Sequence, residues 1–326
     1  MATLYFNGAV DSDWATLGNW WTSGAFTTQA SALPTSSDSV VLSATCSANS
    51  GSAPTVVNLT LNDPNNDTNY LDIAITVTGN ATFNNSAVNE GTVTGDATFN
   101  DSSYNGALAV TGNATFNNSA FNNGGTITGD ATFNNIAYND GGGTVSGDAT
   151  FNDSSYNSVG SVNGNATFND SSSNNDTIAG NATFNDSAFN DGGGTVSGDA
   201  TFNDSAFNYG TVSGNATFND SSYNDYGTGS GGVSGDATFN DSSYNNGGTV
   251  TGNATFNNSS YNLGTVSEDA TFTGSSYNGN IVTGDAFFRD SSYSLSGGAA
   301  YDEYYEQRTP FPIPRGINGS SILGVV

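Results

Sequence analysis

Carboxylates are the only side chains of this chain that could act as acid–base groups in catalysis. The sequence contains no His and no Lys, and its three basic residues are Arg289, Arg308 and Arg315. The chain therefore cannot build a Ser-His-Asp or Cys-His nucleophile, a lysine Schiff base or a zinc site that includes histidine. What is left is paired-carboxylate chemistry of the glycosidase type, or the binding of a hard cation such as Ca²⁺.

The aspartates recur in two periodic columns, both counted from the Phe of a repeated Ala-Thr-Phe motif. Three residues before the Phe, Asp alternates with Asn; two residues after it, Asp fills eight of thirteen places. One enzyme site would break such a repeat, so we expect no enzymatic activity and no cofactor other than a cation. The candidate cation row, with a solvated acidic edge as its alternative, is the consecutive series Asp153, Asp170, Asp186, Asp204, Asp220 and Asp241.

Hydroxyl groups form a second kind of column. Thr or Ser stands on both sides of an aliphatic residue in eight repeats, as in Thr76/Thr78, Thr126/Thr128 and Thr249/Thr251. Parallel Thr columns on a flat β face resemble the arrays of ice-binding solenoids. Thr is also a favoured residue on the solvent side of any strand, and these columns are interrupted at Ala109, Asn163, Ala179, Gly232 and Ile281.

These columns belong to an internal repeat that occupies most of the chain. The spacing between copies is 16 to 18 residues, apart from one step of 21 residues, and self-similarity at such a period predicts a solenoid. The repeat is anchored by Phe83, Phe99, Phe116, Phe133, Phe151, Phe168, Phe184, Phe202, Phe218, Phe239, Phe256, Phe272 and Phe288.

The repeat also predicts which side chains form the core. A Val or Ile stands six residues before every Phe, an Ala two before it, and an aromatic five after it in eleven copies, with Val88 and Ser173 as exceptions. We expect these columns to be buried, with the Phe ladder at their centre. An Asn follows the Phe in eleven copies, from Asn84 to Asn257, and an Asn follows the second aromatic position in twelve, from Asn89 to Asn278. We expect both columns to form hydrogen-bonded ladders along the axis.

A unit of this length is too short for two helices, and its Asn, Asp, Gly, Ser and Thr are poor helix formers. Pieces such as "TVTG", "DATFN" and "SSYN" are typical of short strands, with the Asn-Asp or Asn-Asn between Phe and the next aromatic placed to adopt the αL conformation. We therefore predict an all-β fold: a single-chain parallel β-solenoid, or β-helix, of about thirteen three-sided coils.

The period fails at both ends, which divides the chain into residues 1–70 as an N-terminal cap or attachment region, 71–296 as the shaft and 297–326 as a C-terminal cap or docking tail. A parallel solenoid has an open edge at each end that must be covered to avoid aggregation. Trp14, Trp20 and Trp21, the only tryptophans, are the expected N-terminal cover.

The N-terminal region resembles the corresponding section of bacterial and phage β-helix surface proteins. The likeness covers about sixty residues and consists of a Trp followed by Asn19-Trp20, a Pro-x-x-x-Asp-x-Val-Val stretch from Pro34, and a Val-x-x-Leu-x-Leu strand from Val56. It implies a capped β-helix fold and no particular activity.

The C-terminal region is typical of a segment that lies along the surface of another protein. We therefore expect it to dock on a partner. An alternative is that it folds back to cap the last coil. Its ending "RGINGSSILGVV" is similar to the tails of structural proteins of tailed phages. The candidate docking residues are Tyr301, Tyr304, Tyr305, Phe311, Ile322 and Leu323.

Charge and composition limit the partners. A net charge of -27 repels nucleic acid and anionic membranes, and no segment has the pattern of a signal peptide or a membrane span. The single Cys46 excludes an internal disulfide. We expect a protein of a virion surface or the extracellular space.

The function that these features favour is a non-enzymatic structural rod: a phage or virion fibre, spike, or capsid or tail decoration. Its partners would be other structural proteins of the virion or filament, and resemblance to phage fibres implies a homotrimer. Two alternatives stay open, namely a secreted bacterial surface filament or adhesin module, and an ice-binding solenoid.

Overall fold

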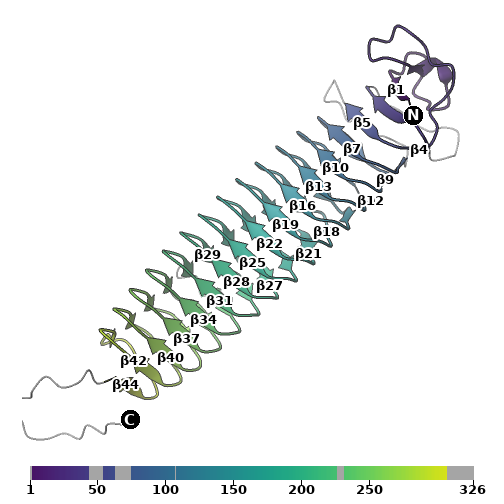
Figure 1. Cartoon of the computed structure of the whole chain (residues 1–326). Helices are drawn as coiled ribbons and strands as arrows, with labels where there is room; N and C mark the ends of the chain where they lie inside the picture. The colour runs from purple at the N-terminus through teal and green to yellow at the C-terminus, as the bar shows by residue number, and fades with distance from the viewer. Residues whose placement is uncertain (1, 44–53, 63–74, 107, 226–230, 307–326) are drawn as a thin grey trace, which may run out of the picture.

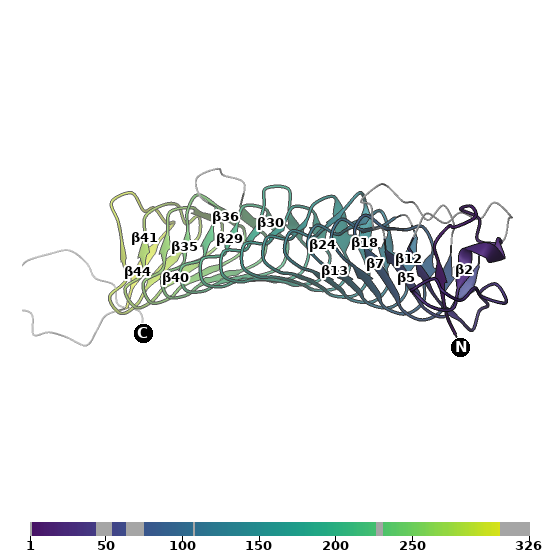
Figure 2. The ribbon, with the colours of Figure 1, turned by 90° about the horizontal axis from the view of Figure 1, so that it is seen from above.

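The chain folds as a parallel β-solenoid of about 14 turns, which confirms the predicted fold class. The computed structural model describes residues 2–43, 54–62, 75–106, 108–225 and 231–306. The coils stack into a rod with β1 (Thr3–Phe6) at one end and β44 (Glu303–Tyr305) at the other (Figure 1). Seen from above, the same stack is continuous between the two ends (Figure 2).

Three sheets form the sides of the rod, and each coil contributes one strand to each side. The coil that contains Phe99 has β10 (Ala97–Phe99), β11 (Tyr104–Asn105) and β12 (Ala109–Val110). Each strand pairs in parallel with its counterparts in the coils before and after, and identical positions face each other, as Phe99 does with Phe83 and Phe116. We name the sides the Phe sheet, the Tyr sheet and the Val sheet.

The Phe sheet has 18 strands. Apart from β1, β10 and β44, its strands are β2 (Trp20–Trp21), β3 (Ser39–Leu42), β5 (Leu59–Asn62), β7 (Ala81–Asn84), β13 (Ala114–Phe116), β16 (Ala131–Phe133), β19 (Ala149–Phe151), β22 (Ala166–Phe168), β25 (Ala182–Phe184), β28 (Ala200–Phe202), β31 (Ala216–Phe218), β34 (Ala237–Phe239), β37 (Ala254–Phe256), β40 (Ala270–Phe272) and β42 (Ala286–Phe288).

The Tyr sheet has 13 strands. Apart from β11, they are β8 (Val88–Asn89), β14 (Phe121–Asn123), β17 (Tyr138–Asp140), β20 (Tyr156–Asn157), β23 (Ser173–Asn174), β26 (Phe189–Asn190), β29 (Phe207–Asn208), β32 (Tyr223–Asn224), β35 (Tyr244–Asn245), β38 (Tyr261–Asn262), β41 (Tyr277–Asn278) and β43 (Tyr293–Ser294).

The Val sheet also has 13 strands. Apart from β12, they are β4 (Thr55–Val56), β6 (Thr76–Val77), β9 (Thr92–Val93), β15 (Thr126–Ile127), β18 (Gly143–Val145), β21 (Gly160–Val162), β24 (Thr177–Ile178), β27 (Thr195–Val196), β30 (Thr211–Val212), β33 (Gly232–Val233), β36 (Thr249–Val250) and β39 (Thr265–Val266).

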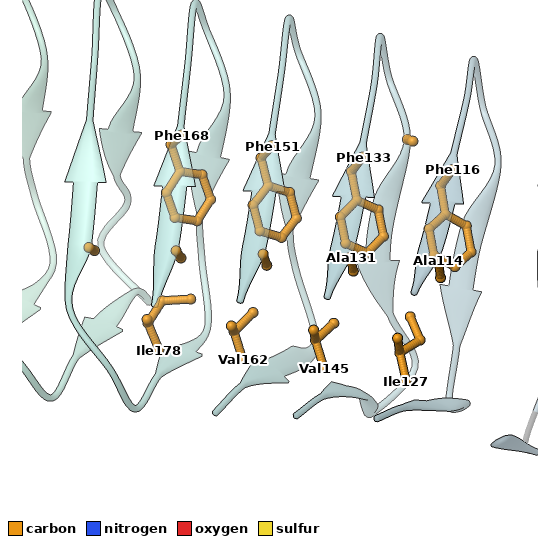
Figure 3. Packing of buried hydrophobic residues seen from close by; sticks show 14 of the residues in the cluster. Ala114, Phe116, Ile127, Ala131, Phe133, Val145, Phe151, Val162, Phe168 and Ile178 are labelled. Carbon is orange, nitrogen blue, oxygen red and sulfur yellow. The ribbon is translucent and has the colours of Figure 1, made fainter. Parts of the chain in front are cut away.

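The apolar core is a set of columns that run along the rod axis. The Phe rings of successive coils stack with centroids 4.7–4.9 Å apart, and the Ala, Val and Ile columns are buried beside them. Figure 3 shows Phe116, Phe133, Phe151 and Phe168 in line, with Val145 and Val162 facing them from the Val sheet. Burying one such aromatic contributes about 1.5–3 kcal/mol, and a single coil alone would leave these groups exposed on both faces.

The second aromatic column is not in the core, which corrects the sequence prediction. Tyr104, Phe121 and their counterparts are only partly buried, whereas the next residue, such as Asn105, is fully buried. The cause is the corner after the Phe, where Asp101 takes the αL conformation with φ 63°. The chain then brings the small Ser103 inward, and strand alternation sends Tyr104 outward and Asn105 inward.

The N-terminal end is closed by a change of strand direction. Strand β2 pairs with β1 antiparallel, whereas β1, β3 and β5 pair in parallel in coil register, so that Phe6, Leu42 and Leu61 lead into the Phe column at Phe83. The 3-10 helix η1 (Leu17–Asn19) precedes β2. Parallel stacking therefore begins within residues 1–70, since β3 and β5 already occupy coil positions.

The C-terminal end carries the solenoid beyond residue 296. Strand β44 pairs in parallel with β42, and Tyr304 and Tyr305 stack on Phe287 and Phe288. Residues 303–305 thus continue the Phe sheet by one strand, and Tyr305 takes the position of the next core Phe.

Candidate functional site

A buried ladder of asparagines runs through the rod on the inner face of the Tyr sheet. From Asn89 to Asn262, Nδ2 donates to Oδ1 of the equivalent Asn in the next coil, for example Asn89 to Asn105 at 2.7 Å and Asn174 to Asn190 at 2.8 Å. Several of these amides also donate to a backbone carbonyl of their own coil, as Asn122 does to Gly125. The predicted ladder is confirmed. It joins Asn89, Asn105, Asn122, Asn139, Asn157, Asn174, Asn190, Asn208, Asn224, Asn245, Asn262 and Asn278.

A second asparagine ladder lies on the outer face of the Phe sheet and has the opposite polarity. Here Nδ2 donates toward the N-terminal end, as Asn100 does to Asn84 at 2.8 Å and Asn203 does to Asn185 at 2.8 Å. The ladder starts at Asn62 and ends where Thr273 donates to Asn257. Both ladders fix the register of coil on coil, and their opposed amide dipoles partly cancel.

The first acidic column, three residues before each Phe, is a backbone-binding ladder. The Oδ1 of each Asp or Asn accepts the N–H of the equivalent residue in the next coil, for example Asp96 from Asn113 and Asn113 from Asp130, both at 2.9 Å. Because both residue types supply this oxygen, they alternate freely. The preceding residue is Gly in every coil except that of Glu268, and a Cβ on Gly95 would lie 2.5 Å from Oδ1 of Asn80.

The second acidic column, which contains the candidate cation row, occupies the corner between the Phe sheet and the Tyr sheet. All thirteen positions have φ between 59° and 70° and are Asn, Asp or Gly, from Asn85 through Gly274 to Asp290. Those residue types tolerate the αL conformation best. The αL conformation alone therefore explains why Asn, Asp or Gly stands at every position of this column, without a ligand.

The structure places the six candidate cation ligands in a row on this exposed corner. They are Asp153, Asp170, Asp186, Asp204, Asp220 and Asp241. Some of the carboxylates accept backbone N–H groups, as Asp153 does from Asn135 at 3.0 Å. Within the described ranges, no three acidic or other metal-binding side chains gather closely enough to hold a metal ion.

The Thr array that sequence reasoning singled out lies on the Val sheet and has interruptions, but the Phe sheet carries an uninterrupted one. The middle residue of each Ala-Thr-Phe strand faces outward, and its partners in register form thirteen successive Thr from Thr60 to Thr271. Phe287 and Tyr304 then replace Thr. The signal in the sequence was the Thr of the motif itself, which is present in twelve of its thirteen copies.

The candidate docking tyrosines gather at the open end of the rod. Tyr301 is 81% exposed, Tyr305 53% and Tyr304 44%. The pKa of Tyr304 is raised above the ordinary tyrosine value, mainly by the negative charge of Asp285 and next by that of Asp302. The remaining docking candidates Phe311, Ile322 and Leu323 lie outside the described residues.

The same end leaves the buried asparagine ladder unfinished. Strand β44 is exposed along its whole length. The Nδ2 of Asn278 and the Oγ of Ser294, its partner in register, are buried and have no hydrogen-bond partner. An unpaired buried donor costs about 1–3 kcal/mol. Among the described residues, the buried hydroxyls of Ser222, Ser260 and Ser276 also lack a partner, but the two groups at this end are the ones left by the end of the ladder.

The described part of the chain holds no helix of the length and apolarity that a bilayer crossing requires. Comparison with protein-family models, with curated proteins and with solved structures finds no match for this chain.

Proposed function

We propose that the chain is a non-enzymatic structural rod, used as a fibre, spike or decoration protein at a virion surface and joined to its assembly through its C-terminal end. The observation that carries the proposal is the register of the coils. The Phe column runs in register from the N-terminal cap to β44, and the other two sheets and the two asparagine ladders keep the same register along the shaft. At about 4.8 Å per coil, some 14 turns make a rod of roughly 65 Å.

The difference between the two ends supports the attachment site. The N-terminal sheet edge is closed by antiparallel β2, whereas among the described residues β44 pairs with β42 alone, at the end that carries exposed Tyr301 and Tyr304. An open edge beside aromatic side chains suits the addition of a strand from another structural protein. Placement in a virion is supported by the likeness of the C-terminal sequence to phage structural proteins.

Immunogold electron microscopy on the culture that produces the protein tests the proposal. Gold on virus particles is the expected result. Gold on cell-surface filaments would replace the virion by a bacterial filament or adhesin, and protein found only free in the medium would overturn both. Sedimentation equilibrium of the purified chain tests the expected trimer.

Docking through the open end is tested by incorporation into the assembly. A Tyr301→Asp/Tyr304→Asp variant should fold but fail to enter the assembly, because both side chains are exposed there. Ile136→Asp is the matched control, since Ile136 is an exposed apolar residue in the middle of the shaft. Equal incorporation of both variants would contradict attachment at this end.

Ice binding is a second candidate because the Thr column of the Phe sheet is uninterrupted. The hydroxyls from Thr60 to Thr271 repeat at about 4.8 Å, beside the outer asparagine ladder, and so form one regular array of polar groups. Thr167→Tyr would break this face, and Thr126→Tyr on the Val sheet is the control. Absence of thermal hysteresis and of ice-crystal shaping in the wild-type protein would end this candidate.

A further inference from the structure

The outer aromatic column of the Tyr sheet is interrupted at one coil. Its rings stack face to face along the axis, with centroids 4.9 Å apart for Tyr138 and Tyr156 and 4.8 Å apart for Phe189 and Phe207. Between Tyr156 and Phe189 the column holds Ser173. The column is therefore two stacks of rings, from Tyr104 to Tyr156 and from Phe189 to Tyr293, separated by one missing ring.

The backbone does not close over this gap. Ser173 pairs with Tyr156 on one side and with Phe189 on the other, and its N–H donates to Ser155 at 3.1 Å as the repeat requires. Two coil steps, about 9.6 Å, therefore separate the facing rings. A guest ring at the missing position would lie about 4.8 Å from each, within the range that stacked aromatic pairs prefer.

The surroundings of the gap are acidic. Asp191 follows Phe189 by two residues and so projects from the same outer face, and Asp176 lies in the coil of Ser173; neither is fully buried. Asp140 is close enough to Tyr156 to act on its phenol. The first basic residue of the chain is Arg289. An aromatic guest that carries positive charge is therefore attracted, and an anionic one is repelled.

We propose that the gap at Ser173 is a binding site for one planar aromatic cation, which completes the stack between Tyr156 and Phe189. The other departure from the aromatic column, Val88, stands at its N-terminal end and is followed by Tyr104 alone. Ser173 is thus the single position at which two ring faces of the column bound the same gap. This property is independent of the role of the rod in an assembly.

The test is titration of the full chain with thioflavin T, a planar aromatic cation, by fluorescence and calorimetry. The wild-type chain should bind one dye per chain. Ser173→Tyr restores the consensus residue, fills the gap and should weaken binding by about tenfold or more. Ser242→Tyr places the same side chain on an exposed corner of a distant coil and should leave binding unchanged.

A gain-of-site variant sharpens the test. Phe121→Ser would open a second gap between Tyr104 and Tyr138, with Asp140 two residues after the second ring, as Asp191 follows Phe189. We expect two dyes per chain in this variant. A planar aromatic anion, naphthalene-2-sulfonate, should bind the wild-type gap at least about tenfold more weakly.

Equal binding by the wild type and Ser173→Tyr would overturn the proposal, as would a stoichiometry of one in a folded Phe121→Ser chain. If Phe121→Ser fails to fold by circular dichroism, the comparison of Ser173→Tyr with Ser242→Tyr decides alone.

Discussion

The two ends of the rod differ in how the edge of the Phe sheet is covered. At the N-terminal end β2 reverses direction, and Trp20 is fully buried between Trp14 and Phe6, with ring centroids 4.6 and 5.1 Å away. Its Nε1 donates to the carbonyl of Trp14 at 2.9 Å. At the C-terminal end β44 continues the parallel pattern and has no cover among the described residues.

This difference shows how the end of a hydrogen-bonded ladder affects the groups that form it. Within the shaft, each coil completes the asparagine ladders of its neighbours, so stability is shared between nearest coils. Where the ladder ends, the same groups are buried without a hydrogen-bond partner, as at Asn278 and Ser294. Under the proposed docking, the repeat that stabilises the shaft is also the template to which a partner strand adds.

The largest expected effect comes from a cap residue. Trp20→Ala removes a fully buried ring and should lower the free energy of unfolding of the N-terminal coils by about 3–5 kcal/mol. Tyr305→Ala, which removes a half-exposed ring at the other end, should cost about 1 kcal/mol or less. Hydrogen exchange resolved along the chain measures both, and equal losses would contradict the contrast between the ends.

The second effect compares one residue type at two places in one ladder. Asn190→Ala removes the ladder acceptor of Asn174, whose Nδ2 keeps only the carbonyl of Asp176, and removes the donor to Asn208. It should destabilise the shaft by about 2–4 kcal/mol. Asn278 already lacks a partner for its Nδ2, so Asn278→Ala should cost about half as much or less. Denaturant unfolding of the two variants gives both values.

A smaller effect of opposite sign comes from extending the ladder. Ser294→Asn would place an Oδ1 in register with Asn278 and supply the missing acceptor. The variant should be more stable than the wild type by about 0.5–1.5 kcal/mol. Ser242→Asn, on an exposed corner, is the control that should change little. A destabilised Ser294→Asn chain would mean that the end is satisfied in some other way.

The smallest expected effect is on tyrosine ionisation. Burial is the main cause that raises the pKa of Tyr138 above the ordinary 10.0, whereas the carboxylate of Asp285 is the main cause for Tyr304. Salt screens the second cause more than the first. High salt should therefore lower the pKa of Tyr304 and leave that of Tyr138 nearly unchanged, as read from absorbance titrations of Tyr→Phe variants.

The same pKa shift gives the direction of the pH dependence. A tyrosine whose pKa is raised in the folded chain contributes stability below pH 10.0 that is lost as the pH rises through the folded pKa. The unfolding midpoint in denaturant should therefore fall at alkaline pH. A midpoint that rises there would contradict the assignment.

Much of the fold follows from the sequence because the repeat is strict. The Phe spacing predicts the coil length, and the Asn and Asp after each Phe predict the αL corner, which the backbone confirms from Asn85 to Asp290. The inner and outer faces of the Tyr strand could not be assigned by hydrophobicity, because the buried residue is Asn and the exposed one is aromatic. Hydrogen bonding along the axis decided that case.

The candidate sites were less predictable for the same reason. A column of Asp is consistent with a ligand row and with a backbone need, and only the geometry of Asp96 and Asp153 reveals the backbone need. Ser173, where we propose that an aromatic cation binds, was visible in the sequence only as a departure from the aromatic column. Its meaning depends on the parallel register that keeps Tyr156 and Phe189 apart.

The most direct test of a rod that is closed at one end and attached by the other is its orientation in the native assembly. A gold label attached to the N-terminal end of the rod, at Ala2, should appear at the free tip in electron micrographs of single particles. Its distance from the attachment point should be roughly 65 Å. A label at the attachment point, with the C-terminal end free, would contradict the assignment of the open end as the docking surface.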